Sequence, residues 1–164
     1  MFREMRRRAQ QLPENACIDV LQRGKTGVLA VQGDGGYPYA VPLNYLYADG
    51  KIYFHCAREG HKIDAIRRDP KVSFCVVDAD EVIAAKYTTA YRSVIAFGRA
   101  KVMEDAQAIF NAIDRLALRY VPDDSTENRH AEMRDGLPKM AMVEIEIDHL
   151  SGKEGLELRK LRDK

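Results

Sequence analysis

Residues 37–62 read YPYAVPLNYLYADGKIYFHCAREGHK, and this stretch decides the fold that we expect for the 164-residue chain. Aromatic and β-branched residues dominate 37–47, which predicts a long strand. Two prolines inside that run cannot donate ladder hydrogen bonds, so the strand is expected at a sheet edge or with a bulge. Asp49-Gly50 then predicts a tight hairpin turn into a second strand over 51–56.

The rest of the chain continues this β-rich pattern. Apolar or alternating runs predict strands over 27–31, 71–77, 91–103 and 140–147, and helical spacing predicts helices over 13–23, 61–69 and 106–120. The run 27–31 is continuously apolar, which is typical of a strand buried on both faces. The polar segments after 77 and over 123–137 are expected to be a connection and a loop with some helix.

Most of these strands are joined by hairpins rather than by crossover helices. The pattern predicts a mainly β fold, a small antiparallel β-barrel with flanking helices packed outside it. We expect a single domain over 1–164, with an N-terminal tail, 1–12, and a charged C-terminal tail, about 154–164.

Composition narrows the class of protein. Hydrophobic residues make up 46% of the chain and charged residues 31%, and the formal net charge is +1. This near balance of positive and negative residues argues against a nucleic-acid-binding protein. The three scattered cysteines favour a reducing compartment, and no apolar run approaches membrane-spanning length. We therefore expect a cytoplasmic protein with no membrane partner.

Gly60, His61 and Lys62, at the start of the predicted helix 61–69, form a candidate anion site. The first N–H groups of a helix are unpaired, and the positive end of the helix dipole lies there. Lys62 adds a full charge, and Gly60 lets the backbone approach a ligand closely. The alternative is an ordinary exposed first turn.

The strand segment 40–44 is a candidate seat for a flat heterocycle. Pro42 interrupts the ladder, so neighbouring backbone groups are free to hydrogen-bond a ring, and Asn44 offers both a donor and an acceptor. A plain edge strand is the alternative. Arg92 and Ser93, at the start of another strand, suit phosphate binding or an ordinary strand-end charge, and the residues do not decide between these.

A metal centre and a hydrolytic site are both disfavoured. His55 and Cys56 are adjacent in one strand and point to opposite faces, so they are poorly placed to ligate one ion. The spacing of histidines and cysteines matches no zinc pattern, and no G-x-S-x-G is present. Cys56 is expected to be buried as a small apolar side chain.

The strings HCAREGHK at 55–62, KVSFCVV at 71–77 and YRSVIAFGRAKV at 91–102, with SGKEG at 151–155, resemble the FMN-binding split-barrel flavoproteins. Within that superfamily, which is related to pyridoxamine 5'-phosphate oxidase, the chain is most similar to the nitroimidazole-resistance (Nim-type) group. The resemblance implies an antiparallel split β-barrel and a homodimer with FMN at the subunit interface.

The resemblance also assigns roles to individual residues. Val41, Pro42, Leu43 and Asn44 would border the isoalloxazine ring, with His55, Cys56 and Ala57 lining the same pocket. His61 and Lys62 would hold the phosphate, and Tyr91, Arg92 and Ser93 would reach in from the other subunit. Pyridoxamine 5'-phosphate oxidases proper resemble each other in an Arg- and Trp-containing C-terminal segment that binds the substrate phosphate. The sequence has no tryptophan and ends in ELRKLRDK, so we do not expect oxidation of pyridoxamine phosphate.

These features predict an FMN-dependent oxidoreductase that acts on a small aromatic or nitroaromatic compound, with NAD(P)H as the electron donor. His55 is the candidate catalytic residue, as a proton donor or substrate contact, because its pKa lies near neutrality. Two alternatives remain open. One is a flavin-binding or storage protein without turnover, and the other is a haem-binding or haem-degrading protein in which His130 or His149 is a ligand.

Overall fold

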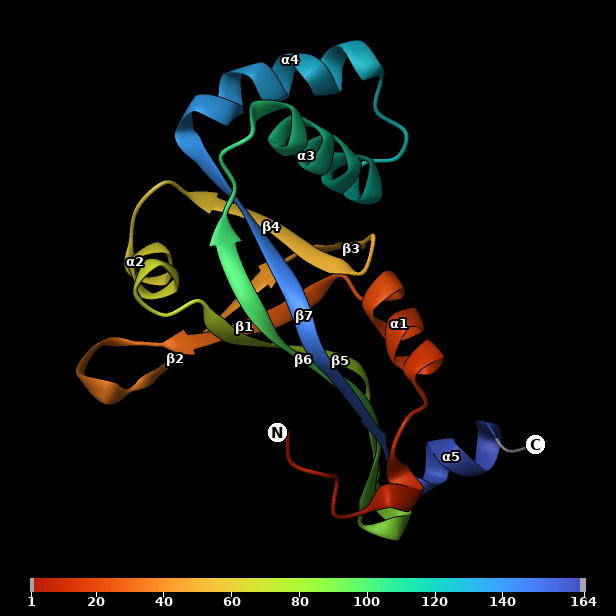
Figure 1. Ribbon diagram of the computed structural model, residues 1–164. Coiled ribbons are helices and arrows are strands. Elements are labelled where there is room, and N and C mark those ends of the chain that lie inside the picture. Colours follow the sequence, from red (N-terminus) through yellow and green to blue (C-terminus); the bar gives the residue numbers. More distant parts are fainter. Residues whose placement is uncertain (1, 163–164) are drawn as a thin grey trace.

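The computed structural model describes residues 2–162, which form one curled antiparallel sheet flanked by helices (Figure 1). The strands are β1 (Thr26–Gln32), β2 (Pro38–Asn44), β3 (Leu46–Ala48), β4 (Lys51–Ala57), β5 (Lys71–Ile83), β6 (Thr88–Val102) and β7 (Met140–Glu154). The helices are α1 (Glu14–Arg23), α2 (His61–Arg68), α3 (Ala106–Tyr120), α4 (Thr126–Gly136) and α5 (Leu156–Arg162). The expectation of a mainly β fold with flanking helices is confirmed.

The order of strands explains how the sheet curls. It runs β2-β1-β5-β6-β7-β4-β3, so β2 and β3 are its two edges. Yet these edge strands are consecutive in the chain and only Tyr45 separates them. The sheet therefore turns back on itself without closing through hydrogen bonds between β2 and β4, which is consistent with a split barrel.

Tyr45 divides the run 37–47, which was expected to be one strand. Its side chain is fully buried, and its hydroxyl donates to the carbonyl of Leu21 at 2.8 Å. Its backbone N–H donates to the hydroxyl of Tyr120, on α3, at 3.1 Å. A side-chain hydroxyl from α3 thus accepts the hydrogen bond that a neighbouring strand would accept in a continuous ladder.

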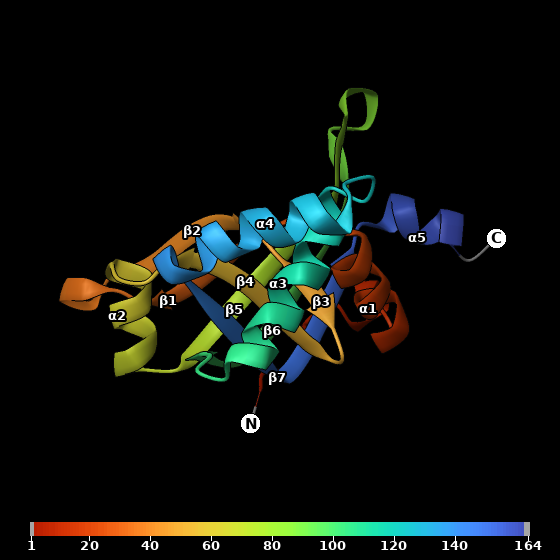
Figure 2. The same cartoon turned by 90° about the horizontal axis from the view of Figure 1, so that it is seen from above.

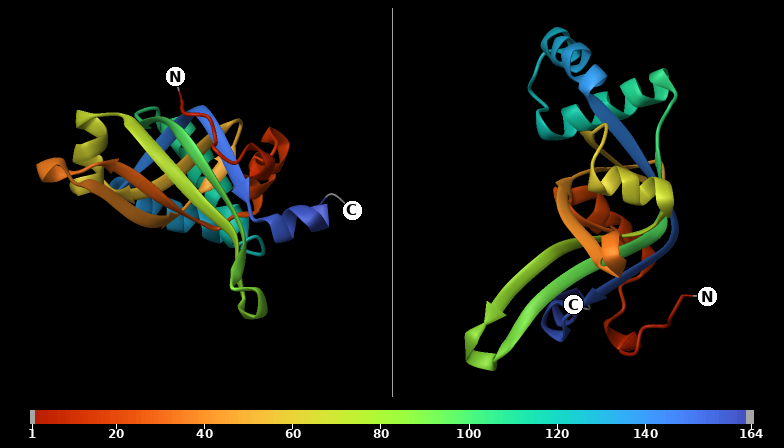
Figure 3. Two further views of the ribbon diagram at one scale, coloured as in Figure 1. Left: turned by 90° about the horizontal axis from the view of Figure 1, so that it is seen from below. Right: turned by 90° about the vertical axis from the view of Figure 1, so that its left-hand side faces the viewer.

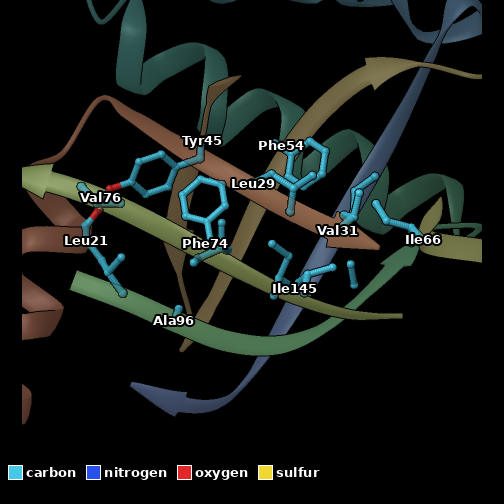
Figure 4. Close-up of a cluster of buried hydrophobic side chains, with 14 of the residues drawn as sticks. Leu21, Leu29, Val31, Tyr45, Phe54, Ile66, Phe74, Val76, Ala96 and Ile145 are labelled. Carbon is cyan, nitrogen blue, oxygen red and sulfur yellow. Dashed lines mark hydrogen bonds between the residues drawn. The ribbon is translucent and has the colours of Figure 1, made fainter. Parts of the chain in front are cut away.

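Two apolar clusters stabilise the fold. The larger one fills the inside of the curled sheet, where Leu29, Phe54 and Phe74 are fully buried (Figure 4). The smaller one lies between the sheet and the α3–α4 layer and includes Leu116 and Met142. Figure 2 shows α3 and α4 lying across one face of the strands.

The predicted hairpin turn at Asp49-Gly50 is confirmed, and a helix cap and a strand irregularity are further local features. Asp49 and Gly50 have φ angles of 54° and 75°, as a tight hairpin turn with positive φ at both positions requires. Asp105 caps α3 by accepting from the backbone N–H of Ala108 at 2.7 Å. The register of β6 and β7 shifts between Phe97 and Gly98, which marks a local irregularity of the ladder.

The connection after residue 77 was predicted wrongly. It is a continuation of β5 and β6, which pair as far as Ile83 and Thr88. The two strands form an arm, residues 78–91, that projects from the rest of the sheet (Figure 3). Local polarity suggested a loop there, and pairing with the neighbouring strand overrides that preference.

The chain ends and the polar segment 123–137 also differ from expectation. Residues 126–136 are helical as α4, and Ser125 caps the helix. Within the supposed N-terminal tail, Gln10 and Leu12 are buried. The supposed C-terminal tail contains the end of β7 and helix α5, whereas residues 163–164 lie outside the described part of the chain.

Strand β1 is buried on one face only, so the prediction of burial on both faces is wrong for the single chain. Leu29 and Val31 point into the core, whereas Val28 keeps 36% of its surface exposed. Pro42, Val28, Cys75 and Ile95 are successive cross-strand partners on the outer side of β2, β1, β5 and β6. This outer face of the sheet, defined by those four residues, is apolar and exposed at Val28 and Ile95.

Candidate functional site

Most of the predicted site residues lie around the seam where β2 and β4 separate. Beyond Tyr45 the chain forms β3, which pairs with the first half of β4. Before Tyr45 it forms β2, which pairs only with β1. The second half of β4 and the whole of β2 therefore border the seam, and α2 lies near its outer end (Figure 1).

On β2, side chains alternate along the seam. Val41 and Leu43 are partly buried and pack against the core, whereas Pro42 and Asn44 point outward and are exposed. The Asn44 amide donates to the carbonyl of Lys25 at 3.0 Å. Because β2 is an edge strand, as its prolines predicted, backbone groups that face away from β1 have no strand partner.

On β4, the predicted residues also face in two directions. Cys56 points toward the core, and burial raises the pKa of its thiol although the charge of Lys62 opposes that effect. His55 pairs with Met142 across the strands and lies on the opposite face of β4, where it is exposed. Its environment nevertheless desolvates the ring and lowers the pKa of His55 below its usual range. Ala57 is exposed where β4 ends.

The start of α2 has the geometry of an anion site. Gly60 precedes the helix with a φ of 117°, a conformation that disfavours residues with a side chain. Its carbonyl accepts from the backbone N–H groups of Ile63 and Asp64, at 2.9 and 3.1 Å. No acceptor within residues 2–162 is recorded for the N–H groups of His61 and Lys62, nor any ion-pair partner for the Lys62 ammonium group.

His61 connects this helix start to β2. Its ring stacks on the ring of Tyr39, with centroids 4.2 Å apart, and its Nε2 lies 3.6 Å from the Asp34 carboxylate. At the other end of the helix, Arg68 pairs with Asp34 at 3.1 Å and donates to the carbonyl of Gln32 at 2.7 Å. Helix α2 is thus fixed to the β1–β2 connection at both of its ends.

Sequence analysis missed Tyr39 and Arg68 as members of this region. Tyr39 shares the inward face of β2 with Val41 by the two-residue period of a strand, and that period was the available signal. The partnership of Arg68 with residues 32–34 has no local signal, because it depends on how α2 folds back over the sheet.

The third group of predicted residues lies elsewhere in the same chain. Tyr91, Arg92 and Ser93 are on β6, which is separated from β2 by three strand spacings, roughly 14 Å. Arg92 points away from the outer face and pairs with Asp78 at 3.3 Å and with the buried Glu154 at 3.2 Å. The guanidinium group of Arg92 is therefore already paired with two carboxylates.

The two histidines that were considered as haem ligands are both engaged. His130 lies 3.2 Å from Asp114 and packs edge-on against Phe110. The ring of His149 stacks on Phe2, with centroids 4.6 Å apart. Within residues 2–162, no three metal-ligating side chains gather closely enough to hold an ion.

Comparison with known proteins identifies the family. A family model described as pyridoxamine 5'-phosphate oxidase matches residues 13–154, so the chain belongs to this family. The match includes the seam, α2 and the whole of the sheet. A search of curated proteins found no match. No helix within residues 2–162 is long and apolar enough to span a membrane.

Solved structures share the fold at low sequence identity. A conserved hypothetical protein of Mycobacterium tuberculosis has a TM-score of 0.80 and 24% identity, covering 95% of this chain and 93% of its own. An FAD- and haem-binding protein of Mycobacterium smegmatis has a TM-score of 0.74 and 22% identity, covering 90% and 74%. A protein assigned to 5-nitroimidazole antibiotic resistance in Bacteroides thetaiotaomicron has a TM-score of 0.73 and 18% identity, covering 87% and 85%.

Proposed function

We propose that the chain binds FMN along the seam, with the phosphate at the start of α2 and the ring against β2. The observation that carries this proposal is the combination of a glycine at φ 117° with Lys62, which has no ion-pair partner among residues 2–162, near a free strand edge. Neutral backbone donors and a lysine suit a phosphate, and edge-strand backbone groups suit the heteroatoms of a flavin ring. Cys56 and Ala57 would lie beside the ribityl and phosphate groups.

We propose further that two copies assemble through the outer face of the sheet and that the flavin lies between them. Pro42 and Asn44 of the seam point to this side, and so does Ser93. Within one chain Ser93 is roughly 14 Å from β2, too far to contact the same ring edge. A second copy would bring its own Tyr91 and Ser93 to the seam, whereas Arg92 would support them from its pairs with Asp78 and Glu154.

The bound flavin would supply hydride and electron transfer, and we propose reduction of a small aromatic or nitroaromatic compound with NAD(P)H as donor. Burial lowers the pKa of His55, and this favours its neutral imidazole. It would therefore act as a neutral N–H hydrogen-bond donor that orients the substrate, rather than as an imidazolium acid. This refines the role that its ordinary pKa suggested.

The phosphate site is tested by comparing FMN with riboflavin, which lacks the phosphate. In Lys62→Gln the affinity for FMN should fall by about tenfold, whereas riboflavin should bind as it does to the unaltered protein. Lys160→Gln removes one exposed charge from α5, which contributes no residue to the proposed site, and should change neither affinity. Equal loss of FMN and riboflavin would contradict phosphate binding at Lys62.

Turnover separates an oxidoreductase from a storage protein. The holoprotein is mixed anaerobically with NADH or NADPH, and bleaching of the flavin absorbance is followed before a nitroaromatic acceptor is added. Reduction and reoxidation support the enzyme. A flavin that stays oxidised with both donors would favour storage without turnover.

A further inference from the structure

A sizeable cavity lies outside the seam. It has a volume of about 680 Å³ and lies between α2, the end of β6, the start of β7 and the α3–α4 layer. Ile66 and Ala100, on one side, belong to the cluster inside the curled sheet. Met142, on the other, belongs to the cluster beneath α3 and α4. The cavity is therefore a gap between two apolar cores that do not pack against each other here.

The lining is mixed, and its apolar part is adaptable. Three of the six methionines of the chain lie in it, Met103, Met140 and Met142, together with Ile109 and Leu137. Methionine side chains are flexible and polarisable, so they adjust to ligands of different shape. The backbone here is well held, since the N–H of Met103 donates to the carbonyl of Met142 at 2.8 Å.

Charged residues that line the cavity are mostly positive. Arg58, Arg67 and Lys101 are exposed there, together with one acidic residue, Glu104. Lys101 is paired with Glu144 at 3.1 Å. Arg58 donates a hydrogen bond from Nη1 to the carbonyl of Pro138 at 3.0 Å. Arg67 has only a 4.0 Å contact with the Asp64 carboxylate. The two guanidinium groups thus keep donors that are directed to no carboxylate at short distance.

We infer that this cavity is a binding site for an amphipathic organic anion, with an apolar body in the methionine-lined space and a carboxylate or phosphate at Arg58 and Arg67. Its volume falls in the range of roughly 300–1,000 Å³ that is typical of small-molecule sites. None of the residues assigned to the flavin seam lines it. The inference therefore stands independently of the proposed flavin function.

Decanoate, decanol and decyltrimethylammonium form a matched set of probes that share a ten-carbon chain and differ in charge. Calorimetric titration of the purified protein, below micelle-forming concentrations, should show saturable binding of decanoate and weaker binding of decanol. The cation should bind most weakly. Equal affinity for all three probes, or no saturable binding of decanoate, would overturn the inference.

Charge variants test the role of the arginines. Arg58→Gln combined with Arg67→Gln should weaken decanoate by about tenfold and leave decanol unchanged. Arg6→Gln combined with Arg7→Gln removes two exposed charges near the N-terminus and should have no effect. Because all four arginines are exposed, unfolding is not expected to obscure the result. An unchanged decanoate affinity in the first double variant would also overturn the inference.

Methionine-methyl NMR locates the bound probe without a cavity variant. Decanoate should shift the signals of Met103, Met140 and Met142 at the concentration at which calorimetry shows saturation. Met5, which is in the N-terminal segment, should not shift. Two results would show that decanoate binds at another site. One is saturable shifts confined to residues outside the cavity, and the other is that these three signals do not move because a second copy covers the cavity.

Discussion

The ring of Tyr39 stacks on the imidazole of His61 with centroids 4.2 Å apart, and this contact joins the free edge of β2 to the start of α2. The two halves of the proposed flavin site, a strand edge for the ring and a helix start for the phosphate, thereby keep a fixed relation. The ion pair of Asp34 with Arg68 supports the same arrangement from the far end of the helix.

We predict that Tyr39→Ala weakens flavin binding by about tenfold, because loss of the stack lets α2 move relative to β2. Affinity is measured by fluorescence quenching of FMN. Tyr37→Ala is the matched control, since Tyr37 keeps 77% of its surface exposed and should be neutral. Equal effects of the two substitutions would mean that the stack does not position the site.

We predict that Ile95→Arg converts a dimer to a monomer and lowers flavin affinity with it. A guanidinium group in the apolar outer face of the sheet would have to be desolvated on assembly. Leu118→Arg is the matched control, because Ile95 and Leu118 are both 38% exposed and Leu118 lies on α3. Light scattering coupled to size exclusion measures the mass, and an unchanged mass in Ile95→Arg would place any interface elsewhere.

We predict that Tyr120→Phe lowers the free energy of unfolding by about 1–3 kcal/mol, because the backbone N–H of Tyr45 loses its acceptor inside the fold. The Tyr120 hydroxyl also lies 2.9 Å from the carbonyl of Tyr45, so both backbone groups at the strand break are affected. Urea denaturation measures the loss. Tyr87→Phe, at a position 99% exposed, should cost nothing.

Low pH should lower the stability of the arm where it joins the sheet, because Asp78 becomes protonated there. A hydrogen bond from Arg23 at 2.6 Å, with a further contribution from Arg92, holds the pKa of Asp78 below its usual range. The native state therefore binds fewer protons there than the unfolded chain. Its stabilising contribution is complete above the ordinary carboxyl pKa of about 4 and is lost as pH falls through the lowered value.

We predict that Asp78→Asn lowers the free energy of unfolding at pH 7 by about 2 kcal/mol and flattens its dependence on pH below about 4. Denaturation series at several pH values measure both effects. Asp80→Asn, two residues along the arm and exposed, should behave like the unaltered protein. A pH dependence in Asp78→Asn as steep as in the parent would contradict the assignment.

Local signals predicted the hairpin, three of the helices and the edge position of β2 correctly, because prolines, Asp-Gly and helical spacing act within a few residues. The arm and the end of β7 were missed because their polar sequences become strands only by pairing with each other. The relation of Tyr39 to His61 and the engagement of Arg92 by Glu154 join residues 22 and 62 positions apart. Such contacts follow from the fold and have no local pattern.

The visible spectrum of the purified protein, with mass identification of whatever is bound, tests the central claim most directly. The account predicts absorbance bands of an oxidised flavin and release of FMN on denaturation, at one flavin per chain. The contradicting result is a colourless protein that takes up no FMN on reconstitution, even at protein concentrations at which the protein is dimeric.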